Sequence, residues 1–557
     1  VTEEDQKKYN LPEKVKDMSQ SQFMLLLQYN SNLWPSLEQY LAEMEKKEEK
    51  YDPEDPKVKE AQAKWRTAFR EYLKDPLLHE KFQKLNDPTR AMYLEWEGGK
   101  AGYSDVRVFA NHQRIKEGKT EPPADLQQVF IDFLGRAKKK SMGNFFDFDL
   151  PKVAEAMIQA IERGVELKYG IDKNTYEERP AVKEVVDLVN KKKKGSIVLV
   201  DPVGLNHQKM AVNDWDDEAK AESLFSSGNL TQSCIGKEGD CVALGKAERP
   251  KNSVPNANHM VLMNGFLPAQ TAANNLLLTL EYGLRGNEYP LGGAFKVFGG
   301  AAKGGKEAPY VVLAFSPRGG LGDINRDLIR RVVLETRGPI RMMQFAFSSQ
   351  ETVDALVERA KLEKKDGKPF DFKSVGDTPF AVRPWSGFLA LTGMELDESK
   401  ETKEYKTAKD APLRKALGAE AHDAVKGDIR VGPPAYRNHN PKGPDGEPLR
   451  DAEGNAVTFN AKIHHKTLMS AGVAIAGTSF NFSEAANSNN EQILVFKDPA
   501  VAAAMNEIFE GLFAMTKTSV EAETARRNEL AKKGDKLDDD LDDIHDKNAE
   551  EGARKKK

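Results

Sequence analysis

One short pattern of residues occurs twice in this chain of 557 residues, once near residue 207 and again near residue 464. Each copy has a histidine two positions before a lysine and, further along, a serine two positions before an asparagine. The first copy consists of His207, Lys209, Ser227 and Asn229, and the second of His464, Lys466, Ser479 and Asn481. Two copies in the same order indicate an internal repeat. The pattern therefore predicts a duplicated domain in which each half supplies half of one site.

The segments around the two copies repeat as well. In each half a helical pattern is followed by an alternating, strand-like run that lies ahead of the histidine. Helices are predicted over residues 153–163 and 351–362, and strands over residues 165–172, 196–200 and 370–377. Helices that alternate with short apolar strands are typical of α/β packing with largely parallel strands.

These patterns divide the chain into four regions. Residues 1–120 are expected to form a helical N-terminal accessory region, because their apolar residues follow helical spacing. The two repeats are expected over residues 121–306 and 307–515, and a charged C-terminal tail over residues 516–557. The predicted fold class is therefore α/β, with two duplicated α/β domains and an α-helical N-terminal region.

The repeated pattern is suited to chemistry at phosphorus. A histidine and a lysine two residues apart on a strand lie on one face, because strand side chains alternate with a period of two. An imidazole can act there as nucleophile or acid, while an ammonium neutralises phosphoryl oxygens. The serine and asparagine add hydroxyl and amide donors. Two such sets facing each other would hold one phosphodiester from both sides.

Asp214 follows the first His-x-Lys pair after four intervening residues. With it, the pattern resembles the phospholipase D superfamily, whose signature is His-x-Lys, four residues, Asp, and then a Gly-Ser-x-Asn-like turn. The resemblance covers roughly residues 126–512 and occurs twice. It implies two phospholipase D-like α/β domains packed about a pseudo-twofold axis, with both histidines at their interface.

The resemblance also implies a mechanism. His207 would attack phosphorus to form a phosphohistidine, and His464 would protonate the leaving oxygen; water, or an alcohol in a transfer reaction, would then resolve the intermediate. It implies catalytic roles for His207, Lys209, Asp214, His464 and Lys466, and phosphate-binding or supporting roles for Ser227, Asn229, Asn258, Ser479, Asn481 and Glu491. Such a scheme requires no metal ion and no cofactor.

The second copy departs from the family pattern at two positions. Ala471 stands in place of the Asp, and Thr478 in place of the Gly before the serine. Glu491 stands where family members often carry an acid that hydrogen-bonds a catalytic histidine, and Asn258 occupies that position in the first copy. If Glu491 were the partner of His464 alone, His464 could be the nucleophile instead of His207.

The substrate class is left open. A formal net charge of -4 gives no overall positive field of the kind that nonspecific nucleic-acid binders use. Two motifs in one chain favour a phosphatidyl group, hydrolysed or transferred at a membrane surface. Residues 478–483 resemble the small bacterial nuclease branch, so an endonuclease acting on DNA or RNA is the alternative, and a noncatalytic phosphate-binding protein is the third. A duplicated chain needs no second copy to complete its site, so we expect a monomer.

Cys234 and Cys241 are the only cysteines, with six residues between them. They could close a small disulfide loop or be two free thiols. Neither they nor any histidine pair has the ligand spacing of a structural zinc site, so no metal is expected. No apolar run reaches the roughly 18 to 20 residues that span a bilayer. The cysteine pair and the start at Val1 favour a secreted or periplasmic protein over a cytoplasmic one.

Overall fold

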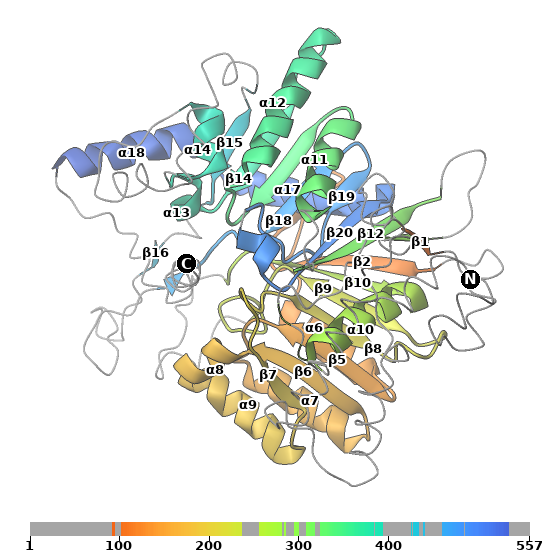
Figure 1. Cartoon of the computed structure of the whole chain (residues 1–557). Helices are drawn as coiled ribbons and strands as arrows, with labels where there is room; N and C mark the ends of the chain where they lie inside the picture. Colours follow the sequence, from red (N-terminus) through yellow and green to blue (C-terminus); the bar gives the residue numbers. More distant parts are fainter. Residues whose placement is uncertain are drawn as a thin grey trace, which may run out of the picture.

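The computed structural model contains two large β-sheets, one formed by the first half of the chain and one mainly by the second half, with helices packed against them (Figure 1). The first half lies in the lower part of Figure 1 and the second half in the upper part. The structure describes residues 92–94, 102–236, 255–280, 283, 285, 294–299, 308–317, 324–383, 385–393, 425, 427–433, 438–439, 459–483 and 485–533.

The first sheet has seven strands in the order β2-β10-β9-β8-β5-β6-β7. The strands β5, β6 and β7 are parallel, whereas β8, β9, β10 and β2 follow one another in antiparallel pairs beside β5. Their bounds are β2 Ser104–Ala110, β5 Lys140–Phe145, β6 Glu166–Asp172, β7 Ile197–Val200, β8 Lys209–Asn213, β9 Glu222–Ser226 and β10 His259–Asn264.

The second sheet repeats this order and adds two strands at one edge. It runs β1-β11-β12-β20-β19-β18-β13-β14-β15, and its strands from β12 to β15 match the first sheet one for one, with the same parallel and antiparallel pairings. Their bounds are β1 Met92–Leu94, β11 Phe295–Phe298, β12 Tyr310–Ser316, β13 Ile340–Gln344, β14 Phe372–Gly376, β15 Asp428–Val431, β18 Lys466–Ser470, β19 Val473–Ile475 and β20 Glu491–Lys497. The predicted α/β fold with duplicated domains is thereby confirmed.

The helices also occupy matching places. Helices α6 Leu126–Arg136 and α11 Ile324–Glu335 precede the first parallel strand of each sheet. Helices α7 Pro151–Glu162 and α12 Gln350–Lys365 connect that strand to the next. Helices α10 Phe266–Leu280 and α17 Pro499–Met515 follow the last antiparallel strand. The remaining elements are α8 Lys173–Glu178, α9 Pro180–Lys192, α13 Thr378–Ala381, α14 Gly387–Thr392, η6 Ala485–Ser488, α18 Val520–Lys533, and the two-stranded pairs β3 Arg114–Lys116 with β4 Lys119–Glu121 and β16 Asn438–His439 with β17 Phe459–Asn460.

Local sequence explains where the connecting helices start. Helix α7 begins with a proline, which has no N–H to leave unpaired in the first turn. In α12, the Ser349 side chain caps the helix by accepting a hydrogen bond from the N–H of Thr352. Val153, Met157 and Ala160 of α7 are all buried, and their spacing places them on one face.

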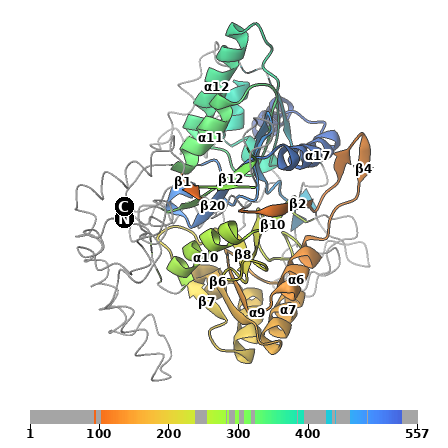
Figure 2. The same ribbon diagram turned by 90° about the vertical axis from the view of Figure 1, so that its right-hand side faces the viewer.

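Helices α10 and α17 join the two halves. Helix α10 contacts β8 of its own sheet and β12 of the other, and α17 contacts β18 of its own sheet and β2 of the other (Figure 2). One buried cluster contains Phe225 and Leu276 from the first half together with Leu313, Phe496 and Phe509 from the second. Each half also has a core of its own. The shared cluster therefore fixes the halves against each other, as a two-sided site requires.

The elements predicted from periodicity are found close to their expected bounds. The helices predicted over residues 153–163 and 351–362 are α7 and α12. The strands predicted over residues 165–172, 196–200 and 370–377 are β6, β7 and β14.

The predicted region boundaries differ from the structure in three places. Strand β2 belongs to the first sheet, so the first repeat begins before residue 121. Strand β11 belongs to the second sheet, so the second repeat begins before residue 307. Helix α18 packs on the second half through Val520, which is fully buried, so the tail does not begin at residue 516. Apart from β1, the predicted helical region up to residue 101 lies outside the described residues.

Candidate functional site

The two His-x-Lys segments lie where the halves meet. Strand β8 begins at Lys209 and β18 at Lys466, so His207 and His464 lie in the short segments just before these strands. The segment before β8 runs beside the residues just before β20, and the segment before β18 runs beside the residues just before β10. Ala257 N–H donates to the carbonyl of Lys462 at 2.7 Å, and Asn490 N–H donates to the carbonyl of Leu205 at 2.8 Å. The same type of contact therefore occurs on both sides of the interface.

Asparagine side chains reinforce both contacts in the same way. The Asn256 side-chain oxygen accepts from the N–H of Lys462 at 2.8 Å, and the Asn489 side-chain oxygen accepts from the N–H of Leu205 at 2.9 Å. Because Asn256 and Asn489 occupy the same position in the two repeats, this pairing shows the pseudo-twofold relation at the level of single atoms. It also positions the residues that follow, Asn258 and Glu491, against the histidines of the other half.

Glu491 is the partner of His207. Both carboxylate oxygens of Glu491 lie 2.8 Å from Nδ1 of His207, and the Glu491 side chain is fully buried. The alternative in which Glu491 serves His464 alone is therefore wrong, because the interface carries each supporting residue across to the opposite half. With Nδ1–H donating to the carboxylate, Nε2 of His207 has its lone pair available.

Asn258 occupies the equivalent position beside His464. Its side-chain oxygen lies 3.0 Å from Nδ1 of His464 and accepts the Nδ1–H of the neutral ring. Burial lowers the pKa of His464 well below its usual value, and the neighbouring charges of Lys466 and Lys209 lower it further. One histidine thus has a carboxylate partner and the other a neutral amide, so the two are chemically different.

The two lysines are buried and arranged alike. Each ammonium donates to the carbonyl of its own histidine at 2.8 Å, Lys209 to His207 and Lys466 to His464. Burial lowers the pKa of Lys209 to about 8 and that of Lys466 well below its usual value. An ammonium has three donors, so both lysines keep donors for an anion. Two desolvated cations beside each other favour a bound negative charge.

A phenylalanine lies beside each histidine and lysine. The ring of Phe146 lies 5.9 Å from that of His207, with Nζ of Lys209 also 5.9 Å from its centroid. The ring of Phe345 lies 4.9 Å from that of His464, with Nζ of Lys466 5.2 Å from its centroid. These rings keep water away from the lysines and so contribute to the lowered pKa values.

Ser227 and Ser479, for which a phosphate-binding or supporting role was expected, hydrogen-bond the residues that support the histidines. The Ser227 hydroxyl donates to the side-chain oxygen of Asn258 at 3.0 Å and accepts from the N–H of His259 at 3.0 Å. The Ser479 hydroxyl accepts from the N–H of Gln492 at 2.9 Å and also hydrogen-bonds to Glu491, which opposes the raised pKa of that carboxyl. Both serines therefore orient the residues that support the histidines.

Asn229 and Asn481 stand at matching positions after these serines. Within the described part of the chain, the side-chain oxygens of both are buried without a hydrogen-bond partner. An unpaired amide oxygen is costly to bury, and two at equivalent positions mark the place where a ligand or water would bind. The phosphate contact expected of both residues stays a prediction.

Asp214 is structural rather than catalytic. Its carboxylate accepts the backbone N–H groups of Lys138, Lys139 and Lys140 at 2.7 to 2.9 Å, and so ties the end of β8 to the start of β5. Its φ of 45° is matched by the same value at Ala471. An aspartate tolerates this left-handed conformation better than most residues.

The second half explains why Ala471 suffices there. Pro339, which precedes β13, has no N–H to donate, and the N–H of Gly338 donates to the carboxylate of Glu363 at 3.3 Å. The Arg359 guanidinium binds the same carboxylate and the Gly338 carbonyl. Two of the three backbone groups that an aspartate would serve are therefore absent or already paired, and the missing Asp removes no reacting atom.

Three buried histidines form a chain of hydrogen bonds behind the site. Gly477 N–H donates to Nε2 of His259 at 2.8 Å, which places the proton of that ring on Nδ1. Nδ1 of His259 then donates to Nδ1 of His465 at 2.9 Å, and Nε2 of His465 donates to Nε2 of His112 at 2.8 Å. Nδ1 of His112 donates to the carbonyl of Gln113 at 3.0 Å. One set of tautomers satisfies every bond, so the chain is neutral.

Burial keeps these three rings uncharged. It lowers the pKa of His112 to about 4 and that of His259 to about 3, and it lowers the pKa of His465 well below its usual value. The chain crosses between the halves and fixes the residue next to His464. Sequence reasoning missed this role of His112, because no local pattern connects it with His465.

Several expectations concern features away from the histidines. Cys234 is buried and free, and Cys241 lies outside the described residues, so a disulfide between them stays a prediction. In the described ranges, no helix combines the length and apolar character needed to cross a membrane. Across the same residues, no group of three or more His, Cys, Asp or Glu side chains is placed to hold a metal ion.

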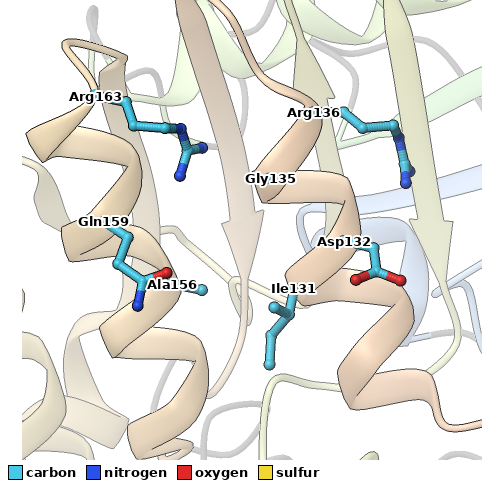
Figure 3. A pocket seen from close by; sticks show the side chains of 7 residues that line it. All are labelled: Ile131, Asp132, Gly135, Arg136, Ala156, Gln159 and Arg163. Carbon is cyan, nitrogen blue, oxygen red and sulfur yellow. The ribbon is translucent and has the colours of Figure 1, made fainter.

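A pocket of about 330 Å³ lies between α6 and α7, apart from the histidines (Figure 3). Arg136 of α6 and Arg163 at the end of α7 face it from opposite sides. Both are engaged, Arg136 with the carboxylate of Glu222 at 3.1 Å and Arg163 with the carbonyl of Leu134 at 2.9 Å. Its lining is Ile131, Asp132, Gly135, Arg136, Ala156, Gln159 and Arg163, and none of them is a predicted site residue.

Comparisons of this chain with known proteins found similar solved structures of low sequence identity. No protein-family model and no curated protein matches the sequence. A phosphatidylserine synthase from Haemophilus influenzae is similar over 81% of this chain and 95% of its own, with 12% identity and a TM-score of 0.49. Nuc, a phospholipase D family member from Salmonella typhimurium, is similar over 38% of this chain and 97% of its own, with 18% identity and a TM-score of 0.21.

A polyphosphate kinase from Porphyromonas gingivalis is similar over 77% of this chain and 55% of its own, with 9% identity and a TM-score of 0.39. At these identities and TM-scores, we draw no conclusion about the reaction from any of the three. The function has to be argued from the site.

Proposed function

We propose that this chain is a phosphodiesterase of the phospholipase D superfamily that acts through a phosphohistidine. The observation that carries the proposal is the reciprocal support of two histidines across the interface, His207 by Glu491 and His464 by Asn258. Two buried lysines accompany them. A pair of histidines with unequal partners suits a nucleophile and an acid, because the two tasks need opposite protonation states.

His207 is the proposed nucleophile. The Glu491 carboxylate holds its proton on Nδ1, leaving the Nε2 lone pair to attack phosphorus. As the nitrogen–phosphorus bond forms and the bond to the leaving oxygen breaks, the ring becomes positively charged. The buried carboxylate stabilises that charge, whereas an amide would not. The carboxylate on the His207 side therefore favours His207 over His464 in this role.

His464 is the proposed acid. Its low pKa leaves it neutral in the free protein, with the single proton on Nδ1 toward Asn258. A phosphodiester anion bound between Lys209 and Lys466 would offset the repulsion that lowers this pKa. His464 would then take up a proton on Nε2 as the substrate binds and pass it to the leaving oxygen. In the second step it would accept a proton from the attacking water or alcohol.

The proposed substrate is a phosphatidyl group, which the chain would hydrolyse or transfer at a membrane surface, as a monomer that is secreted or periplasmic. Support comes from the apolar rings of Phe146 and Phe345 beside the two histidines. A nucleic-acid phosphodiester is the second candidate, because Phe345 continues into Phe380 and Trp385, and such rings can stack on bases. A noncatalytic role is less well supported, since both histidines and both lysines are kept.

One set of assays tests the proposal. Purified protein is incubated with bis(p-nitrophenyl) phosphate, with vesicles of phosphatidylglycerol and of phosphatidylcholine, and with single-stranded and double-stranded DNA. We expect hydrolysis of the simple diester and of one natural class, and its loss in both His207→Asn and His464→Asn. Lys183→Met, which changes an exposed lysine on α9, passes through the same purification and should keep full activity. Full activity in either histidine variant would contradict the shared site.

A further inference from the structure

A third lysine lies beside His464 and has no counterpart in the first half. Lys462 precedes His464 by two residues, as Lys466 follows it by two. The equivalent residue before His207 is Leu205, which makes the matching backbone contact to the other half. The two histidines therefore differ in charge surroundings as well as in their partners. The His-x-Lys pattern does not include this position, although a period of two would have pointed to it.

Lys462 is buried, and its ammonium faces the aromatic group next to His464. Its side chain is only 7% exposed in total. Nζ lies 5.3 Å from the ring centroid of Phe345 and 5.9 Å from that of Phe380. Phe345 in turn lies 4.9 Å from the His464 ring. The charge of Lys462 also lowers the pKa of His464, so the ammonium lies close enough to the imidazole to affect its protonation.

The rings extend this environment outward. The centroid of Phe380 lies 4.4 Å from that of Phe345, and the half-buried Trp385 lies 5.6 Å from Phe380. Rings with a free face could hold a quaternary ammonium group. Here the Lys462 ammonium already lies over two of them, so a second cation would be repelled. A negative charge would instead be attracted by Lys462 and Lys466 together.

From this cluster we infer that the His464 side is a subsite for a leaving group that carries its own phosphate. The inference rests on the proposed function, in which His464 protonates the leaving oxygen and so faces the departing alcohol. A phosphate on that alcohol would reach Lys462 while the scissile phosphate lies between Lys209 and Lys466. Such an alcohol can come from a lipid headgroup or from a nucleotide. A choline headgroup is disfavoured.

The test compares substrates that differ only in this phosphate. In the lipid arm, phosphatidylglycerol phosphate is compared with phosphatidylglycerol in nonionic detergent micelles at equal mole fraction. In the nucleotide arm, the thymidine dinucleotide with a terminal 3′-phosphate is compared with the same dinucleotide without it. The readout is the ratio of kcat/KM values within each arm. Bis(p-nitrophenyl) phosphate, whose leaving group is uncharged, reports the basic activity separately.

The wild-type protein should prefer the phosphate-bearing member in one arm by at least about tenfold, which identifies the source, as expected when a buried cation meets a charged group. Lys462→Met, which keeps the apolar stem on the rings, should abolish the preference, and Lys462→Arg should retain it. The control is Lys296→Met, because Lys296 is also buried and lies 3.7 Å from the Tyr310 ring centroid, but on β11. That variant should keep the wild-type ratio, and melting temperatures confirm folding of all variants.

The outcomes separate the two levels of the proposal. If the simple diester is hydrolysed in a His207-dependent way but neither arm shows a preference, or if Lys462→Met keeps the preference, the subsite is wrong and the phosphodiesterase stands. A higher kcat/KM for phosphatidylcholine than for phosphatidylglycerol phosphate would likewise overturn the subsite. If the simple diester and all lipid and nucleotide substrates are left intact, the proposed function fails and the subsite with it.

Discussion

Replacing Glu491 by glutamine tests how much of the chemistry depends on the carboxylate behind His207. The substitution keeps the size of the side chain and one oxygen that can accept the Nδ1–H bond, which is 2.8 Å long in the wild type. It removes the negative charge. With the carboxylate about 4 Å from the charge on the phosphorylated ring and an effective dielectric constant of about 20, that interaction is about 4 kcal/mol. The retained hydrogen bond offsets part of it, so kcat should fall by roughly 10²- to 10³-fold.

The pH dependence gives a second readout of the same variant. Burial raises the pKa of Glu491 to about 8, although Lys209 opposes the shift. A protonated Glu491 has no negative charge to stabilise the phosphorylated ring, so wild-type kcat/KM should rise as pH increases through this range. It should fall again as Lys209 loses its proton, because burial lowers the pKa of that ammonium to about 8. In Glu491→Gln the rising limb should disappear.

The stability of the fold should change with pH in the opposite sense to the activity. A carboxyl whose pKa is raised on folding contributes stability below its unfolded value near 4.5, and that contribution is lost as pH rises toward about 8. Glu491→Gln should therefore melt at a higher temperature than the wild type above pH 8. The assay is bis(p-nitrophenyl) phosphate hydrolysis across this range, with thermal melts on the same samples. A variant that keeps more than a tenth of wild-type kcat, or the rising limb, would refute the role of Glu491 as the partner of the nucleophile.

Three further predictions follow from the site. Asp214→Ala removes an acceptor of three backbone N–H groups, so it should lower the free energy of unfolding by about 3 kcal/mol while changing kcat less than about threefold; a large loss of kcat in folded protein would make Asp214 catalytic. Inorganic phosphate should bind with proton uptake at neutral pH, because its charge offsets the effects that lower the pKa of His464; calorimetry in buffers of different ionisation enthalpy measures this, and no uptake would contradict the coupling. Activity should survive dialysis against EDTA, since Lys209 and Lys466 supply the positive charge at phosphorus; loss that only a divalent metal restores would contradict it.

The parts of the fold that the sequence predicted are those encoded locally. The strands β6 and β14 and the helices α7 and α12 have clear periodicity, and the histidine pair is marked by its repetition. The strands β2 and β11 were missed, because β2 carries several polar or exposed residues and β11 has only four residues. Their place in the sheets depends on neighbours far away in the chain.

The partners of the site residues depend on packing between the halves, which no local pattern records. Glu491 and His207 are 284 residues apart, and the sequence left open whether Glu491 supports the histidine of its own repeat. The role of Asp214 depended on which N–H groups approach the end of β8. The sequence left open whether the serines bind phosphate or support other residues, and in the structure they hydrogen-bond Asn258 and Glu491.

The most direct test of the account is to locate the covalent intermediate. Trypsin separates the two histidines, since residues 195–209 contain His207 alone and residues 463–466 contain His464. His464→Asn, mixed with bis(p-nitrophenyl) phosphate and quenched in alkali to preserve phosphohistidine, should carry the added p-nitrophenylphosphoryl mass on the peptide 195–209. The mass on the peptide 463–466 of the wild type, or on neither peptide while hydrolysis proceeds, would contradict His207 as the nucleophile.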